Sequence, residues 1–475
     1  MFRLRFISFT LAESVVSLLP VLSSSVLAST LSIHLDSIKS LGLPVITIET
    51  MDGEEPTCER ADPPEEEGAV GMGITNATKV PGRLCITLGG DTLYDSGPYV
   101  KGGAGMRIKI RGNSSAYPQK KPYKVKLEAG TDLLLRGDEE TYSDKDWLLI
   151  KDPDLRQSIG YETSRLMGME WTPGYRYVNV VMNGDYRGLY LLCEPVERNT
   201  RCRINVSETG YIVESDAYFW NEDLYIPSSL RPFGWTFKYP DEDNITEERL
   251  VWLTSELAGL EEALSGDSYA ERIDVESFAR WLLTHDILGT WDSYGSNLFV
   301  SRYDSLDSKA RMPVLWDFDT IFRMEGAWAN IHRERFFFHH MLASGDETFR
   351  RTYSELWNEI KYDVFEGMQS FIKKFASSEE AKAIDASMRI DAERWHSEYH
   401  GISEHLDMAH LWFESRKAWL DEHIAEEFGG LPIDAVIRDS IEPFEPIFNV
   451  YGIPIIYGST GLMIRGGKKY IIKNQ

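Results

Sequence analysis

The stretch "VLWDFDTIF", residues 314–322, places two carboxylates inside an otherwise apolar run. Burying a charge costs free energy unless the charge is paired or holds a metal ion. Side chains alternate along a strand, so Asp317 and Asp319 are predicted to leave the same strand face. Because carboxylate oxygens are hard ligands that suit Mg²⁺ or Mn²⁺, the stretch predicts a site for a divalent metal.

The residues before this stretch extend the predicted site. The segments "NLFVSRY" (297–303) and "MPVLWDFD" (312–319) flank a polar segment and predict a hairpin. Antiparallel pairing about its midpoint would bring Asn297 roughly opposite Asp317. Asp292 lies just before Asn297, at the end of a predicted helix. Carboxylates and one amide are therefore expected to converge at one end of the hairpin.

The spacing of these residues is informative. Asp292 and Asn297 form a D-x-x-x-x-N pattern, and Asp317 follows across the hairpin. Protein kinases place a catalytic Asp, a metal-binding Asn and a metal-binding Asp in that order. In that interpretation Asp292 accepts the hydrogen bond of a substrate hydroxyl. Asn297 and Asp317 hold the metal that neutralises the phosphates.

Residues 101–127 supply cations. They contain eight Lys or Arg and no Asp or Glu, in a chain of net charge −25, and include a Gly-Asn-Ser-Ser turn suited to anions. Lys124 and Lys126 are predicted to leave one strand face, where either could bind phosphate and pair with Glu162 on the next predicted helix. The alternative is a solvated strand face, although such faces usually mix signs.

The layout of the chain predicts an α+β fold. Residues 29–240 read mostly as strands with one central helix, and residues 241–428 read as helices around the hairpin. Residues 429–475 read as a linker and a short β-tail. Residues 1–28 have the basic, apolar and small-residue order of a signal peptide cleaved after Ala28. An ordinary N-terminal helix is the alternative.

The composition of the chain limits the kinds of partner that the protein is expected to bind. The strong negative charge argues against a general nucleic-acid binder, and no apolar span of membrane-crossing length follows the N-terminus. The four cysteines show no metal-site spacing. They are Cys58, Cys85, Cys193 and Cys202, and the expectation is buried thiols or one structural disulfide.

Several segments together resemble the spore-coat protein H (CotH) kinase family of atypical protein kinases. They are "LPVITIET", "RGNSSAYPQKKPYKVKLE", "DWLLIKDPDLRQSIGYETSRLMG", "VNVVMNGDYRGLYLLCEPV", "DSYGSNLFVSRY", "VLWDFDTIF" and "WFESRKAWLDEHI". The resemblance runs from about residue 44 to 425. The tail, residues 451–475, resembles C-terminal β-segments of exported proteins from Bacteroidetes-type bacteria.

The resemblance implies an atypical bilobal protein-kinase-like fold and transfer of phosphate from ATP, with Mg²⁺ or Mn²⁺, to Ser or Thr of an unidentified protein. It implies a catalytic Asp292 and a metal site of Asn297, Asp317 and Asp319. The predicted signal peptide implies a secreted or cell-envelope location. The implied nucleotide-binding residues are Lys124 or Lys126, Glu162, Arg111, Asn113, Ser114 and, in the hinge-like segment "GLYLLCEPVE" (188–197), Glu194.

Other functions compete with the kinase. A D-x-D after an apolar strand is also how glycosyltransferases hold a metal and a sugar nucleotide, but that leaves Asn297 and the lysine-rich strand without roles. A glycosidase is disfavoured because its carboxylates flank the scissile bond rather than share one strand face. A cell-surface adhesin that kept the fold without turnover is the non-enzymatic alternative.

Overall fold

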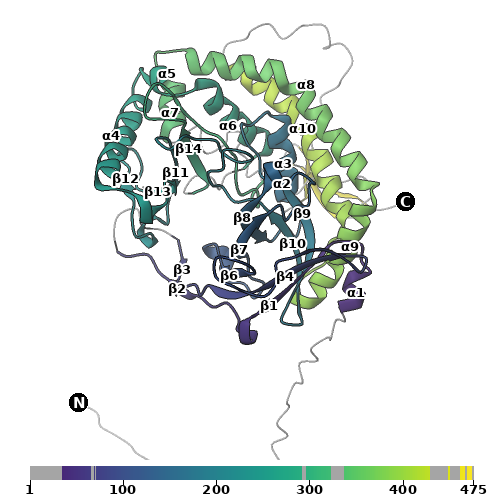
Figure 1. The fold of residues 1–475 in the computed structure, drawn as a ribbon. Helices are drawn as coiled ribbons and strands as arrows, with labels where there is room; N and C mark the ends of the chain where they lie inside the picture. The colour runs from purple at the N-terminus through teal and green to yellow at the C-terminus, as the bar shows by residue number, and fades with distance from the viewer. Residues whose placement is uncertain are drawn as a thin grey trace, which may run out of the picture. The chain divides into compact units, whose positions relative to one another are not determined.

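The computed structural model describes residues 35–65, 69, 71–290, 296–322 and 336–427, and the backbone of three short strands near the C-terminus. The predicted signal peptide lies outside these ranges, as does Asp292. Within the described residues the fold is mixed α+β, with most strands in the N-terminal half and long helices in the C-terminal half (Figure 1).

Seven strands of the N-terminal half close into a barrel. Its order is β1 (Val45–Thr50), β9 (Tyr175–Met182), β10 (Asp185–Cys193), β8 (Asp144–Ile150), β7 (Tyr123–Thr131), β6 (Met106–Ile110) and β4 (Val80–Leu88). The barrel closes because β4 hydrogen-bonds to β1 as well as to β6, and β5 (Asp91–Asp95) continues the sheet from β4. Closure leaves few unpaired strand edges.

Along β6 and β7, side chains point alternately into the barrel and toward its outer face. Ile108 and Val125 are fully buried inside the barrel, whereas Lys109 and Lys124 alternate with them on the outer face. Lys109 pairs directly with Lys124 across the two strands. The cation-rich segment therefore places two like charges side by side on one face of the barrel.

A second sheet lies next to Asn297, which immediately precedes its strand β14. Its order is β12 (Ile226–Pro227), β13 (Gly234–Tyr239), β11 (Tyr211–Asp216), β14 (Leu298–Arg302) and β15 (Ala310–Arg311). Buried residues of this sheet, of one barrel face and of the helices form one continuous hydrophobic core. A smaller core fills the barrel.

The predicted hairpin forms only in part. Ser301 pairs with Arg311, so the register differs from the predicted one, and pairing ends there. Pro313 lacks an N–H, and its carbonyl instead accepts a hydrogen bond from the Trp171 N–H at 3.0 Å. Asp317 then adopts a left-handed φ of 64°. The prediction that Asp317 and Asp319 leave the same face of a paired strand is therefore wrong, because the backbone here is not paired in the sheet and turns at Asp317.

The predicted helices are present. They include α3 (Arg156–Leu166), α4 (Glu247–Leu264), α6 (Val275–Leu288), α7 (Phe336–Ala343), α8 (Thr348–Ala376), α9 (Glu379–Trp395) and α10 (Ile402–Glu427). Side chains of Thr246 and Asp274 cap α4 and α6, and Gly289 ends α6 with a φ of 62°. The helices α8 and α10 lie side by side, and α9 lies against β10 (Figure 1).

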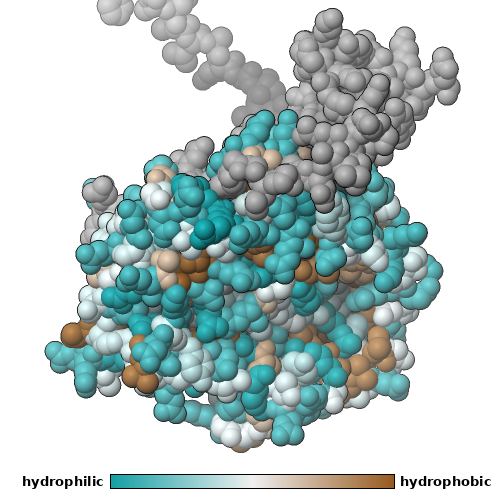
Figure 2. Space-filling view, turned by 90° about the horizontal axis from the view of Figure 1, so that it is seen from above, coloured by the Kyte–Doolittle hydropathy of each residue, from teal (hydrophilic) through white to brown (hydrophobic). Residues whose placement is uncertain are grey.

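Four further observations complete the description of the fold. The described tail strands, β16 (Phe448–Asn449), β17 (Gly461–Arg465) and β18 (Lys468–Ile472), form an antiparallel sheet. All four cysteines are free thiols. No helix in the described ranges combines the length and apolar character needed to cross a bilayer. The face seen in Figure 2 is mostly hydrophilic, with hydrophobic side chains in several separate groups.

Candidate active site

A cleft of about 1280 Å³ opens between the barrel and the second sheet. One side is formed by β6, β7 and the loop 111–115, and the other by β11, β13, β14 and the segment 316–319. The charged and amide side chains that concern the site are Lys109, Arg111, Asn113, Lys124, Glu197, Glu214, Asp216, Lys238, Asn297, Asp317 and Asp319. The volume is ample for a small-molecule ligand.

Most of the predicted site residues line this cleft. Predicted metal ligands stand on one side and predicted phosphate-binding residues on the other, although they are distant in sequence. Those lining it are Arg111, Asn113, Ser114, Lys124, Asn297, Asp317 and Asp319. Lys126, Glu162 and Glu194 do not line it, and Asp292 lies outside the described residues.

Asn297 is held by its backbone. Its φ is 65°, a left-handed conformation that Asn tolerates better than most residues. The Asn297 N–H donates to Glu214 Oε1 at 2.8 Å, and Glu214 Oε2 lies 2.9 Å from Lys238 Nζ. Beside it, the Ser296 hydroxyl donates to Asp216 Oδ1 at 2.7 Å. The carboxylates of β11 therefore fix the start of β14.

Asp317 is held by helix α3. Its Oδ1 accepts a hydrogen bond from Gln157 Nε2 at 3.0 Å, and the following residue, Phe318, is fully buried against Tyr161 with ring centroids 5.5 Å apart. Asp319 is exposed, and its backbone carbonyl accepts from Arg156 Nη1 at 2.8 Å. The left-handed turn at Asp317 brings both carboxylates to the cleft without a paired strand.

The cations of the barrel differ in their partners. Lys124 Nζ lies 2.6 Å from Glu197 Oε1 and 3.1 Å from Asp146 Oδ1. Burial disfavours the charged form of Lys124, but the two carboxylates outweigh burial and raise its pKa. Burial, and then the neighbouring Lys124, lower the pKa of Lys109. Lys109 is therefore a half-buried cation placed against another cation.

The predicted pairing of a barrel lysine with Glu162 is wrong. Glu162 is on a side of α3 where Arg165 and the Tyr175 hydroxyl bind its carboxylate. Glu197, which follows β10, pairs with Lys124 instead. The sequence gives no sign of this partner, because residues 124 and 197 meet only when the barrel closes.

Two other predicted nucleotide-binding side chains lie elsewhere. Lys126 is half exposed, pairs with Asp146 at 3.1 Å and does not reach the cleft. Glu194 is buried, and its carboxylate accepts hydrogen bonds from the Gly174 N–H and from Arg136. The hinge-like segment does reach the cleft, but with residues 195–197.

Sequence reasoning missed the acidic residues of β11. Glu214 and Asp216 line the cleft from within an ordinary strand pattern, "YIVESD". Burial, and then Glu214, raise the pKa of Asp216 to about 7. A carboxylate whose pKa is perturbed as strongly as that of Asp216 is typical of functional sites, but nothing in the sequence distinguishes Glu214 and Asp216 from a polar strand face.

The donor set of the cleft fits a hard divalent cation. Asn297, Asp317 and Asp319 offer amide and carboxylate oxygens, which Mg²⁺ and Mn²⁺ prefer. Across the described ranges, no three Asp, Glu, His or Cys side chains cluster tightly enough to form a metal site by themselves. Such a site would therefore draw on the amide, and on oxygens that a ligand brings.

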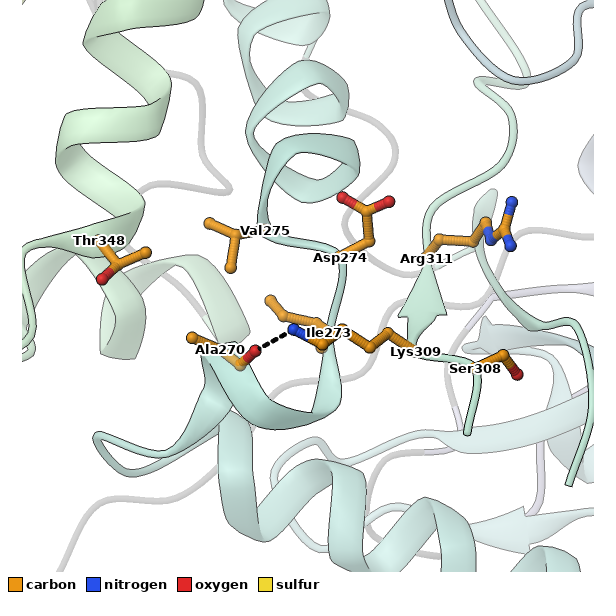
Figure 3. Close-up of a pocket in the computed structure, with 8 residues that line it drawn as sticks. All are labelled: Ala270, Ile273, Asp274, Val275, Ser308, Lys309, Arg311 and Thr348. Atoms are coloured by element: carbon orange, nitrogen blue, oxygen red, sulfur yellow. Dashed lines mark hydrogen bonds between the residues drawn. The ribbon is translucent and has the colours of Figure 1, made fainter. Parts of the chain in front are cut away.

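A second hollow of about 400 Å³ lies beside α6 and β15 (Figure 3). Its charged residues already have structural roles. Lys309 Nζ donates to the Ala270 carbonyl at 2.7 Å, Arg311 pairs with Glu170 at 2.9 Å, and Asp274 caps α6. This hollow therefore offers no set of groups for chemistry comparable to that of the cleft.

The chain was compared with curated proteins and with solved structures. None of the curated proteins searched matches it significantly. Eighteen chains of solved structures match. One is from a complex of the Shewanella oneidensis MR-1 toxin–antitoxin proteins HipA and HipB with operator DNA. It is 12% identical, has a TM-score of 0.27, and the match covers 60% of each chain.

The family comparison is broader. Residues 108–420 match the family model described as CotH kinase protein, which is well over half of the 475 residues. The matched range contains the lysines of β7, helix α3, the start of β14 and the segment with Asp317. This chain belongs to the CotH kinase family.

Proposed function

We propose that this chain is an exported, ATP- and divalent-metal-dependent protein kinase that phosphorylates Ser or Thr of a protein acceptor. One observation carries the proposal: barrel cations face amide and carboxylate oxygens across a single cleft. Phosphates need the cations, and the metal that accompanies a nucleoside triphosphate needs the oxygens. Family membership supports the same chemistry.

Each group of residues then has a part in phosphoryl transfer. Lys109, Arg111 and Lys124 bind the phosphates, and Glu197 keeps Lys124 charged and oriented. Asn297, Asp317 and Asp319 would hold the cation, which would neutralise charge on the phosphates. The acceptor hydroxyl oxygen forms a new bond to the γ-phosphorus while the bond to the ADP oxygen breaks. Asp292 accepts the hydrogen bond, and then the proton, of that hydroxyl.

Thermal unfolding with ATP and Mn²⁺ or Mg²⁺ tests the nucleotide site. A ligand at a hundred times its Kd that binds only the folded state adds about 2.7 kcal/mol, which a melt resolves. The expected result is a metal-dependent rise in Tm that Asp317→Ala abolishes. An unchanged Tm in the wild-type chain would contradict the proposal and favour the adhesin. Incubation with radiolabelled ATP and candidate acceptors would then measure transfer.

A further inference from the structure

Helix α3 contacts Asp317, a residue that lines the cleft, through one buried side chain whose amide oxygen has no hydrogen-bond partner among the described residues. Gln157, in its first turn, is 6% exposed and donates Nε2–H to Asp317 Oδ1 at 3.0 Å. Its other amide atom, Oε1, is buried and has no hydrogen-bond partner among the described residues. A buried acceptor left without a donor costs free energy, so it calls for an explanation.

The orientation of this amide is fixed by chemistry. An ionised carboxylate only accepts hydrogen bonds, so the amide nitrogen of Gln157 must face Asp317 and Oε1 must face away from it. The Gln157 backbone is fixed too, since its N–H donates to Asp152 Oδ1 at 3.0 Å. Asp152 is itself bound by the Tyr177 hydroxyl at 2.6 Å. Turning the amide over would place Oε1 against the carboxylate and lose the bond to Asp317.

We infer that Gln157 is a positioning residue of the metal site. Its N–H orients the Asp317 carboxylate, and its Oε1 accepts a hydrogen bond from the hydration water of the divalent cation. Mg²⁺ keeps several waters when it binds with phosphates, so donors arrive together with the ion. Replacing a residue that hydrogen-bonds to a metal ligand commonly weakens metal binding by about ten- to a hundredfold. This inference rests on the proposed function.

The contact between Gln157 and Asp317 gives α3 a role that differs from the predicted pairing of Glu162 with a barrel lysine. The helix does not send a carboxylate to the barrel lysine, because Glu162 is bound to Arg165 and Tyr175. It contacts the metal-binding segment instead, through Gln157 at Asp317. The helix is therefore expected to set metal affinity rather than the affinity for the phosphates themselves.

The test separates these two affinities. The variants are Gln157→Leu and Gln157→Met, which keep the approximate size of the side chain and remove both amide groups. Binding of ATP without metal, in EDTA, is measured beside binding of Mn²⁺ at saturating ATP, by calorimetry and by the electron paramagnetic resonance of free Mn²⁺. We expect the Kd of Mn²⁺ to rise tenfold or more, with metal-free ATP binding and the unliganded Tm retained.

The matched control is Glu162→Gln, on the same helix but away from the cleft. It is expected to leave the Kd of Mn²⁺ unchanged. If the wild-type chain binds no Mn²⁺ with ATP, the proposed function and this inference both fall. If it does, and both Gln157 variants bind Mn²⁺ as tightly, only the inference is overturned. An equal loss in Glu162→Gln would also overturn it, as a general disturbance of α3.

Discussion

At the scale of single residues, Lys109 differs from its neighbour Lys124 in having no carboxylate ion pair within the described ranges. We expect Lys109→Met to weaken ATP binding about ten- to a hundredfold, because a charge-assisted hydrogen bond contributes roughly 1.5–3 kcal/mol. The unliganded Tm should stay the same or rise, since a cation repelled by Lys124 is removed. Calorimetric titration and a melt measure the two effects.

The control for this prediction is Lys126→Met. Lys126 is half exposed, carries the same charge and lies outside the cleft. Its replacement should change ATP affinity far less than that of Lys109. Equal losses in the two variants would mean that long-range charge, rather than contact in the cleft, accounts for the effect.

His285 predicts how the protein responds to acid. Complete burial lowers its pKa to about 3 from an ordinary value of 6.5. Between these values the unfolded chain binds a proton that the folded chain does not, so stability falls as the pH drops through this window. The loss amounts to the order of 4 kcal/mol by pH 3.

The measurement is urea unfolding from pH 7 to pH 4 in the wild type and in His285→Gln. Gln cannot be protonated and retains a polar group for Thr290, the hydrogen-bond partner of His285. We expect the variant to lose less stability than the wild type over this range. Parallel curves for the two proteins would contradict the prediction.

At the scale of elements, the packing of α3 against the segment 316–319 allows only glycine at position 160. A Cβ on Gly160 would lie 2.1 Å from Cγ of Phe318. Gly160→Ala should therefore displace Phe318 and with it Asp317. We expect the unfolding free energy to fall by about 1–3 kcal/mol, as overpacked cores do, and the Kd of Mn²⁺ with ATP to rise.

Gly259→Ala in α4 is the matched control, because its Cβ would meet only the end of the flexible Arg272 side chain at 3.0 Å. Ala is favoured over Gly in a helix by about 1 kcal/mol, so this variant should be neutral or more stable. A Gly160→Ala protein that melts and binds Mn²⁺ like the wild type would show that Phe318 can repack freely.

The helices and strands could be predicted from the sequence, because hydrophobic periodicity and helix caps depend on residues close together in the chain. Thr and Asp are common N-cap residues, and Thr246 and Asp274 stand at the starts of α4 and α6, while Asn-Gly is a typical hairpin turn and residues 183–184 join β9 to β10. The contacts between elements that are distant in the sequence could not be predicted in the same way. Lys124 forms an ion pair with Glu197, and this contact depends on closure of the barrel. Asp317 accepts a hydrogen bond from the Gln157 amide, and this contact depends on the packing of α3.

At the scale of the whole molecule, an ion pair that is mostly shielded from solvent joins α9 to the barrel. Asp391 of α9 accepts hydrogen bonds from Lys120 Nζ at 2.6 Å and from the Leu189 N–H of β10 at 2.9 Å. Lys120 also donates to the Leu189 carbonyl at 2.6 Å. Gly188 leaves room for this contact, since a Cβ there would lie 1.9 Å from Asp391 Oδ1.

Removing one partner of this pair should cost far more than removing both. Lys120→Met or Asp391→Leu alone leaves a largely shielded charge without its counter-charge, which costs up to about 3–5 kcal/mol. The double variant leaves no charge, so its loss should be clearly smaller than the sum of the single losses, and urea unfolding of all four proteins measures the difference. Glu379→Ala, which breaks the exposed Glu379–Lys382 pair on the same helix, should change stability by less than about 1 kcal/mol. Additive losses at Lys120 and Asp391 would mean that apolar packing, rather than this ion pair, joins α9 to the barrel.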